Sequence, residues 1–223
     1  MMQNRTPAEL ITAIDADPRH PGRFVLLVDG RPLATLPLDV IERVGVRIGA
    51  PVAPMRDRLE REVAALKTYD RAANMLTARA RSAADLERHL VRKGEPVELA
   101  KAAVERLRAA GFLDDASFAR QFVRSKSLGA GLATRRLRQE LARRGVERDV
   151  ADAALDEVFA EENVDEQEGA EAVARKRLRS LASEDGATRR RRLYAYLARR
   201  GYDPDTIART LERVLSSDGS VDG

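Results

Sequence analysis

Few residues of this 223-residue chain have the types and spacing that catalysis requires. The two histidines, His20 and His89, lie far apart in the sequence, and no cysteine is present to act as a nucleophile or thiolate ligand. Two pairs of aspartates, at 15 and 17 and at 203 and 205, have a spacing seen in metal sites. Each pair lies beside a proline at a turn or helix start, where aspartate is expected as a cap. Since phosphate-loop and nucleophile-elbow motifs are also missing, we expect no enzyme, no cofactor and no metal site.

Charged residues, which make up 34% of the chain, are grouped by sign. Residues 124–148 contain eight basic and two acidic residues, and residues 175–200 contain ten basic and two acidic, for net charges of +6 and +8. Between them, residues 149–171 contain ten acidic residues and no basic residue. The simplest interpretation of the acidic block is a solvated helix face that pairs with the basic faces.

The basic blocks are harder to explain by internal pairing alone. Arg189 to Arg192 surround the start of an expected helix, where the helix dipole disfavours positive charge. Arginine rather than lysine favours bidentate contacts with phosphate or carboxylate. We therefore expect an anionic partner, either nucleic acid or an acidic protein surface. Tyr194 and Tyr196 lie among these arginines, and because they face different sides of a helix, at most one of them belongs to the core.

A short pattern, Leu-x-x-x-Leu-x-basic-basic-Gly, positions these blocks and occurs three times. Leucines four apart share one helical face, the basic pair complements the negative end of the helix dipole, and the glycine adopts the left-handed conformation that ends the helix. Apolar residues also recur ten and thirteen residues after each glycine. We therefore expect three tandem three-helix units. The copies are Leu86 to Gly94, Leu137 to Gly145 and Leu193 to Gly201, and the recurring apolar residues are Val104, Leu155 and Leu211, then Leu107, Val158 and Val214.

Local signals predict the helices of each unit. The first has a long helix over 55–79, with a possible break at Tyr69 and Asp70, a helix started by Ser82 and a helix after Pro96. The second has a helix capped by Asp114 or Asp115, with Phe112, Phe118 and Phe122 expected in the core, then helices over 133–144 and 148–159. The third begins with a capping box of Asn163 and Glu166, which starts a helix to about Leu181. A basic helix to Arg200 and a helix started by Asp203-Pro204 follow it.

The first 50 residues differ from the rest. Three short antiparallel strands are expected, with a tight hairpin at Asp29-Gly30 and a short helix over 40–44 that ends at Gly45. Residues 49–54 have the composition of a linker. So small a sheet is only marginally stable alone, so we expect it to pack on the following helix or on a partner.

Composition agrees with a mainly α fold in an elongated array. Aromatic residues make up only 4% of the chain, which disfavours one thick core. No apolar run approaches the roughly 20 residues of a membrane span, and we expect a cytoplasmic protein. The expected domains are a β-hairpin-containing subdomain at 1–50, a linker, long helix and first repeat at 51–110, the second repeat at 111–160, the third at 161–215, and a flexible tail at 216–223.

The run from Gly111 to Lys126, read as Gly-Phe-Leu-Asp-Asp-x-x-Phe-Ala-x-x-Phe-Val-Arg-Ser-Lys, closely resembles the middle repeat of RecX proteins. The helix that ends in Leu141-Ala142-Arg143-Arg144-Gly145-Val146 extends the resemblance, which covers about residues 65–215. The resemblance implies a negative regulator that binds the RecA–DNA filament and inhibits ATP hydrolysis, strand exchange and cleavage of the LexA repressor in the SOS response. It implies as partners the RecA filament and single- or double-stranded DNA, for a protein that we expect to be a monomer.

Two alternatives remain beside this hypothesis: a helical DNA-binding or transcriptional protein that acts without RecA, and an N-terminal sheet that serves as a separate protein-docking module. On the RecA hypothesis, electrostatic docking is assigned to basic residues of the second and third units. These are Arg124, Lys126, Arg135, Arg136, Arg138, Arg143, Arg144, Arg189, Arg190, Arg191, Arg192, Arg199 and Arg200.

Overall fold

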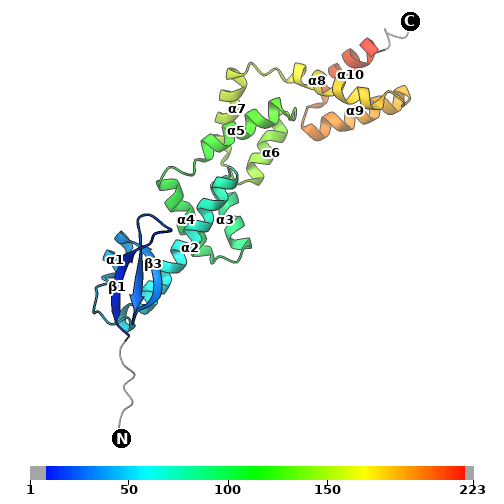
Figure 1. Cartoon of the computed structure of the whole chain (residues 1–223). Helices are drawn as coiled ribbons and strands as arrows, with labels where there is room; N and C mark the ends of the chain where they lie inside the picture. The colour runs from blue at the N-terminus through cyan, green and yellow to red at the C-terminus, as the bar shows by residue number, and fades with distance from the viewer. Residues whose placement is uncertain (1–8, 219–223) are drawn as a thin grey trace. The chain divides into compact units, whose positions relative to one another are not determined.

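The computed structural model describes residues 9–218 of the chain (Figure 1). Within this range the chain forms a three-stranded antiparallel sheet followed by ten α-helices, which confirms the predicted fold class of tandem helical units with a small N-terminal sheet. The described residues divide into two compact units. The first holds residues 9–79 and 87–110, and the second holds residues 80–86 and those from 111 onward.

The N-terminal sheet is a meander of β1 (Ile11–Ala16), β2 (Arg23–Val28) and β3 (Arg31–Pro37) in the order β1-β2-β3. The hairpin between β2 and β3 turns at the two predicted residues, since Asp29 and Gly30 have φ values of 47° and 75°. Helix α1 (Leu38–Val44) follows directly and ends at the left-handed Gly45, as predicted.

The sheet shares one hydrophobic core with helix α2 (Arg56–Ala78), because Leu59 and Leu66 of α2 pack with Leu26 and Leu36 of the strands. This agrees with the expectation that the sheet packs on the following helix. Residues 49–54 do not form the expected free linker. They lie along the edge of β1, where the amide of Ile11 donates to the carbonyl of Ala50 and Val52 is fully buried.

Helix α2 continues through Tyr69 and Asp70 without the possible break, because both residues have partners in the first unit. The carboxylate of Asp70 accepts two hydrogen bonds from the guanidinium of Arg23, at 2.7 and 2.6 Å. The guanidinium of Arg106 lies 4.4 Å from the centroid of the Tyr69 ring. Two helices follow α2 in the first repeat, namely α3 (Ala83–Arg92) and α4 (Val97–Ala109).

The second and third repeats each contain three helices. In the second they are α5 (Asp115–Leu128), α6 (Thr134–Arg143) and α7 (Arg148–Glu161). In the third they are α8 (Glu166–Leu178), α9 (Gly186–Arg200) and α10 (Pro204–Asp218), with a 3-10 turn (Arg179–Leu181) after α8.

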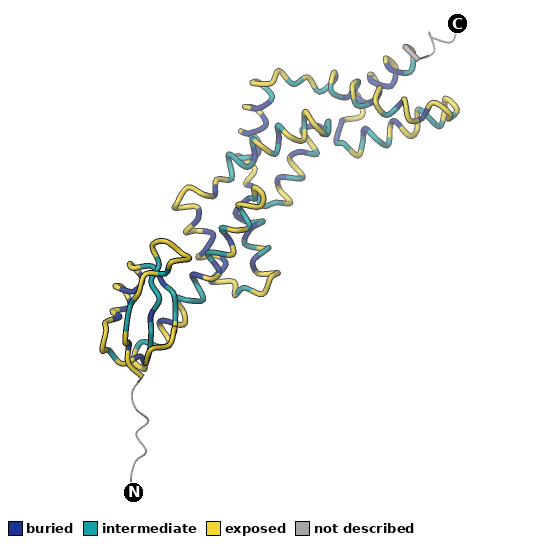
Figure 2. The backbone as a smooth tube through the Cα atoms, viewed as in Figure 1, coloured by how far each residue is buried: buried dark blue, intermediate teal, exposed yellow. Residues whose placement is uncertain are grey.

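The repeated pattern has the structure that its residue types predicted. The six leucines of the three copies are fully buried, and the six recurring apolar residues after the glycines are at most 2% exposed (Figure 2). Gly94, Gly145 and Gly201 have φ values of 91°, 78° and 94°, so each ends its helix in the left-handed conformation. Each repeat thus buries a thin apolar face between helices that carry charge on their outer sides.

Two local predictions were wrong. Asp165, and not Asn163, caps α8 by accepting hydrogen bonds from the amides of residues 167 and 168, while Asn163 takes a left-handed conformation in the preceding turn. Phe112 is 70% exposed and does not belong to the core. Phe118 and Phe122 are half-buried and pack against the core of the second repeat, as expected.

Candidate polyanion interface

The predicted contact residues all lie in the second unit, and several are already paired with the acidic block. Arg124 on α5 donates to Glu161 at 2.6 Å and to Glu162 at 2.7 Å, both at the end of α7. Arg138 on α6 donates to Asp152 at 2.5 Å, and this contact lowers the pKa of the Asp152 carboxyl below its usual range. Pairing of this kind agrees with the interpretation of the acidic block as a helix face that pairs with basic faces. The pairs join α5 and α6 to α7 and so lie within the second repeat.

Glu140 neutralises the basic end of α6. Its carboxylate lies 2.6 Å from the guanidinium of Arg136, 3.2 Å from that of Arg143 and 2.8 Å from that of Arg144. These contacts, with the hydrogen bond from Arg144 as the largest cause, lower the pKa of Glu140. Arg144 also lies over the ring of Phe122, 4.5 Å from its centroid. The second copy of the basic pair is therefore largely occupied within its own repeat.

Five other predicted residues are exposed and make no ion pair within residues 9–218. They lie at the end of α5, at the start of α6 and along α9. Arg189 is half-buried at the start of α9, and Arg192 pairs with Glu184 at 2.5 Å. The positive charge that remains accessible is therefore concentrated on α9, which has six arginines and no acidic residue. The five are Lys126, Arg135, Arg190, Arg191 and Arg199.

The structure brings two of the basic segments together at the contact between the second and third repeats. The amide of Ala133, just before α6, donates a hydrogen bond of 3.0 Å to the carbonyl of Arg200, the last residue of α9. A side chain at the next residue, Gly201, would lie 2.5 Å from Cβ of Arg136. The basic start of α6 therefore lies directly against the basic end of α9.

The same kind of contact joins the start of α3 to the second repeat. Ser82 donates to the carbonyl of Arg144 at 2.5 Å, and the amide of Ala83 donates to the carboxylate of Asp115 at 2.8 Å. At the start of α6, the amide of Thr134 donates to the carboxylate of Glu166 at 2.6 Å. Both carboxylates belong to the first residue of the next repeat's first helix, and each contact spans 32 residues. An acid from the following repeat thus satisfies the amide end of each of these helices.

The sequence did not predict these contacts between repeats, because the pattern around Glu166 indicated a local capping box. The signal was present, since Asp115 and Glu166 occupy the same position in their repeats. It became visible only when the partner amides, at the starts of α3 and α6, were known to be close to these acids.

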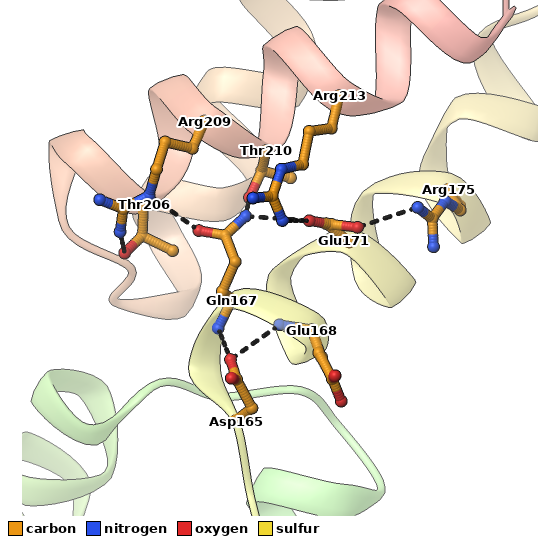
Figure 3. A network of polar contacts seen from close by, with 9 residues as sticks. All are labelled: Asp165, Gln167, Glu168, Glu171, Arg175, Thr206, Arg209, Thr210 and Arg213. Atoms are coloured by element: carbon orange, nitrogen blue, oxygen red, sulfur yellow. Dashed lines mark hydrogen bonds and ion pairs between the residues drawn. The ribbon is translucent and has the colours of Figure 1, made fainter.

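Within the third repeat, a polar network locks α8 to α10 (Figure 3). Gln167 donates to the hydroxyl of the buried Thr210 at 3.0 Å and to Glu171 at 3.1 Å. Glu171 also accepts from Arg213 at 2.8 Å and from Arg175 at 2.9 Å. The hydrogen bond from Arg213 is the largest cause of the lowered pKa of Glu171. Arg175 and Arg213 are therefore engaged inside the repeat.

Two tyrosines of the third repeat lie at its contact with the second. The hydroxyl of Tyr202 donates to the carbonyl of Gly131 at 3.2 Å, and burial raises the pKa of this tyrosine to about 12. Tyr196 is half-buried and its ring contacts the guanidiniums of Arg177 and Arg200, whereas Tyr194 is 45% exposed, so neither is a fully buried core residue. A cleft of about 500 Å³ lies beside Tyr196, with Lys176 and Arg200 in its lining.

No helix in the described part of the chain is long and apolar enough to cross a membrane. Between Glu9 and Ser216, no group of three or more histidine or acidic side chains is arranged to hold a metal ion.

Profiles of known protein families match most of the helical region. The profiles described as the first, second and third three-helix domains of RecX match residues 69–107, 114–155 and 165–211. The regulatory protein RecX of Mycobacterium avium (strain 104) is 37% identical over 145 residues, which cover 65% of this chain and 82% of the relative. The regulatory protein RecX of Mycolicibacterium vanbaalenii is 41% identical over 132 residues, which cover 58% and 72%.

Two solved structures share the fold. A crystal structure of regulatory protein RecX matches with a TM-score of 0.72 at 21% identity and covers 89% of this chain and 96% of its own. The crystal structure of RecX from Lactobacillus salivarius matches with a TM-score of 0.54 at 16% identity, and covers 68% and 96%.

Proposed function

The chain belongs to the RecX family, and from this membership and the accessible arginines of its last two repeats we propose that it is a negative regulator of the RecA recombinase. In this proposal the protein is a cytoplasmic monomer that binds the RecA–DNA filament. By binding, it inhibits ATP hydrolysis, strand exchange and the RecA-dependent cleavage of LexA.

The observation that carries the proposal is the uncompensated charge of α9. Its six arginines include Arg190, Arg191 and Arg199, which are exposed and make no ion pair in the described residues. Arginines at a helix start oppose the helix dipole, so this arrangement costs stability unless an anionic partner offsets it. A filament of recombinase on DNA presents phosphates, and it supplies such a partner.

The proposed mechanism needs no catalytic group. A chain of tandem repeats offers several docking surfaces, so it is suited to contacting more than one subunit of a filament. Binding of the regulator shifts the equilibrium between two forms of the filament only if the regulator has different affinities for these two forms. We propose that the regulator favours a form of the filament that is inactive in ATP hydrolysis.

The direct test is the rate of ATP hydrolysis by RecA on single-stranded DNA, measured with increasing amounts of this protein. We expect inhibition at less than one regulator per recombinase. The variant with Arg190→Gln, Arg191→Gln and Arg199→Gln should require at least tenfold more protein, because it loses accessible charge.

A charge-reducing control separates docking from fold. The variant with Arg175→Gln and Arg213→Gln removes two arginines that are paired with Glu171 inside the third repeat. It should unfold more readily and still inhibit while it is folded. If the wild-type protein leaves ATP hydrolysis unchanged at every ratio, the proposed function is wrong.

A second candidate function is DNA binding without RecA. The observation in its favour is the exposed Tyr194, which lies one helical turn from Arg190 and Arg191 on α9, since an aromatic ring beside arginines suits contact with bases. Tight, sequence-selective binding to duplex DNA in the absence of recombinase would favour this candidate, whereas weak binding without sequence preference would favour the filament regulator.

A further inference from the structure

One position of the repeated pattern carries a different side chain in each repeat. Three residues after the first leucine of the pattern stand His89, Glu140 and Tyr196. In the second repeat, Glu140 neutralises Arg136, Arg143 and Arg144. In the third repeat a tyrosine takes the place of the acid, so the equivalent basic end lacks that internal counter-charge.

Tyr196 instead holds two arginines by contact with its ring. The guanidinium carbon of Arg200 lies 4.0 Å from the ring centroid, and that of Arg177, from α8, lies 5.4 Å away. The Nε atoms of both arginines are buried and meet no hydrogen-bond acceptor. Neither arginine makes an ion pair within residues 9–218. Since arginine is always charged, the fold holds two cations on one ring by cation–π contact rather than by a carboxylate.

This arrangement differs from that of Arg144, a half-buried arginine of the second repeat. Arg144 also lies over an aromatic ring, that of Phe122, but Glu140 accepts hydrogen bonds from its guanidinium. Two positive charges on one ring, without an acid, repel each other and cost free energy when partly desolvated. An oxyanion placed between them would remove this cost and accept hydrogen bonds from the terminal nitrogens of both.

We propose that Arg177 and Arg200, oriented by Tyr196, bind a phosphate group of a nucleic-acid backbone. The assignment rests on the proposed function for its physiological setting, a filament that contains DNA, and it names the residues that would contact the phosphate. Arg177 was not among the residues predicted from the charge blocks, and Tyr196 is a positioning residue because it acts through the two guanidiniums.

The surroundings favour a polyanion over a single carboxylate. Helix α9 continues the positive charge from Arg200 back to Arg190, over about 15 Å at the helical rise, and carries no acid along this length. Duplex DNA carries one negative charge for about every 1.7 Å of its axis, so a row of this length faces several phosphates. The neighbouring cleft is also lined by Glu162, Asp165 and Glu168, so phosphates should follow α9 and avoid these acids.

The test is binding of the full-length chain to a fluorescently labelled oligothymidine, followed by anisotropy at several salt concentrations without recombinase. The variant with Arg177→Gln and Arg200→Gln should bind at least tenfold more weakly. Its slope of log affinity against log salt should be smaller by about 0.7, because one phosphate contact on a single strand is lost. The control with Arg175→Gln and Arg213→Gln loses the same formal charge from positions that are paired with Glu171, and should keep the wild-type slope.

Two substitutions at the same position test the role of the ring. Tyr196→Glu restores the acid of the second repeat and should reduce binding as strongly as the double variant. Tyr196→Phe keeps the ring and should bind within about twofold of the wild type. In the second repeat, Glu140→Gln releases three arginines and should strengthen binding, which gives a readout that loss of folding cannot imitate.

The inference is overturned if the double variant keeps the wild-type affinity and salt slope, or if polyglutamate of equal charge competes as well as unlabelled oligothymidine. The second result would assign the site to an acidic protein surface. If the protein inhibits RecA but the variant with Arg177→Gln and Arg200→Gln binds oligothymidine as the wild type does, this inference is wrong and the proposed function stands. If oligothymidine binding requires these two residues but the protein does not inhibit RecA, the proposed function is wrong and this inference stands.

Discussion

The backbone amide of Ala133 donates a hydrogen bond of 3.0 Å to the carbonyl of Arg200, and this bond joins the start of α6 to the end of α9. Beside it, Gly201 approaches the backbone of Arg136, and Tyr202 donates to the carbonyl of Gly131. The basic end of the third repeat is therefore held in place by backbone contacts, which leaves its arginine side chains available for other partners.

Gly201→Ala should destabilise the second unit more than Gly111→Ala. Both glycines are left-handed, which costs an alanine about 1 kcal/mol. At Gly201 the added methyl would also lie 2.7 Å from the backbone nitrogen of Arg136, whereas at Gly111 it would meet no atom within 4 Å. We expect losses of about 3 and about 1 kcal/mol in the free energy of unfolding, measured with urea. Equal losses would show that the close approach of Gly201 to α6 does not occur.

Glu166→Ala should destabilise α6, although the residue belongs to α8. The substitution removes the carboxylate that accepts from the amide and hydroxyl of Thr134, so the start of α6 loses a cap worth about 1–2 kcal/mol. Amide hydrogen exchange should accelerate in the first turn of α6. Glu168→Ala, which removes an exposed acid from the same turn of α8, is the control and should leave exchange in α6 unchanged.

The stability of the third repeat should fall as the pH rises from about 10 to about 12. Burial raises the pKa of Tyr202 to about 12 in the folded protein, above the value of about 10 in the unfolded chain. The contribution of Tyr202 to the free energy of unfolding is therefore complete below pH 10. It is lost as the pH rises further, because the tyrosine of the unfolded chain releases its proton first. Tyr202→Phe should cost about 1 kcal/mol at neutral pH, by loss of the hydrogen bond to Gly131, and should remove this part of the alkaline decline. Urea unfolding at pH 8 to 11 measures both effects, and parallel pH profiles for the two proteins would contradict the prediction.

At acidic pH the second repeat should weaken through Glu140. Its pKa is lowered in the folded state by Arg144, Arg136 and Arg143, so its contribution is present above the unfolded pKa of about 4.3 and is lost as the pH falls through the folded value. Glu140→Gln should cost about 1 kcal/mol at pH 7, the size of partly exposed ion pairs, and nothing at pH 2. Urea titrations at the two pH values test this, with Glu147→Gln on the exposed helix start as the control. An equal loss at both pH values would assign the effect to packing rather than charge.

Salt should reduce the stability of the second repeat through Arg124. Its side chain bridges α5 to Glu161 and Glu162 of α7 and is 43% exposed, so these pairs are open to screening. Arg124→Gln should lower the midpoint temperature of unfolding at low ionic strength, and should lower it less at 1 M salt, because salt screens exposed ion pairs. Thermal unfolding at the two salt concentrations measures the difference, and Lys126→Gln, whose side chain has no ion pair in the described residues, should show none.

The helices and their ends could be predicted because their signals are local. Leu137 and Leu141 are fully buried and Gly145 is left-handed, as the spacing of an α-helix and the chemistry of its end require. Local signals failed where two neighbours competed for one role, as Asn163 and Asp165 did for the cap of α8. They also failed at Phe112, whose apolar side chain predicted a core position that the packing of the second repeat does not provide.

The sequence by itself determined that three repeats exist, which family they belong to, and where basic residues concentrate, because all three properties depend on residue type and spacing along the chain. Only the tertiary structure decided which arginines are neutralised. The acids that pair with Arg124 lie 37 and 38 residues away, and the position that holds Glu140 in one repeat holds Tyr196 in the next. Charge pairing acts through space over a few ångströms, so the block of positive charge seen in the sequence becomes a binding surface only where folding brings no carboxylate to it.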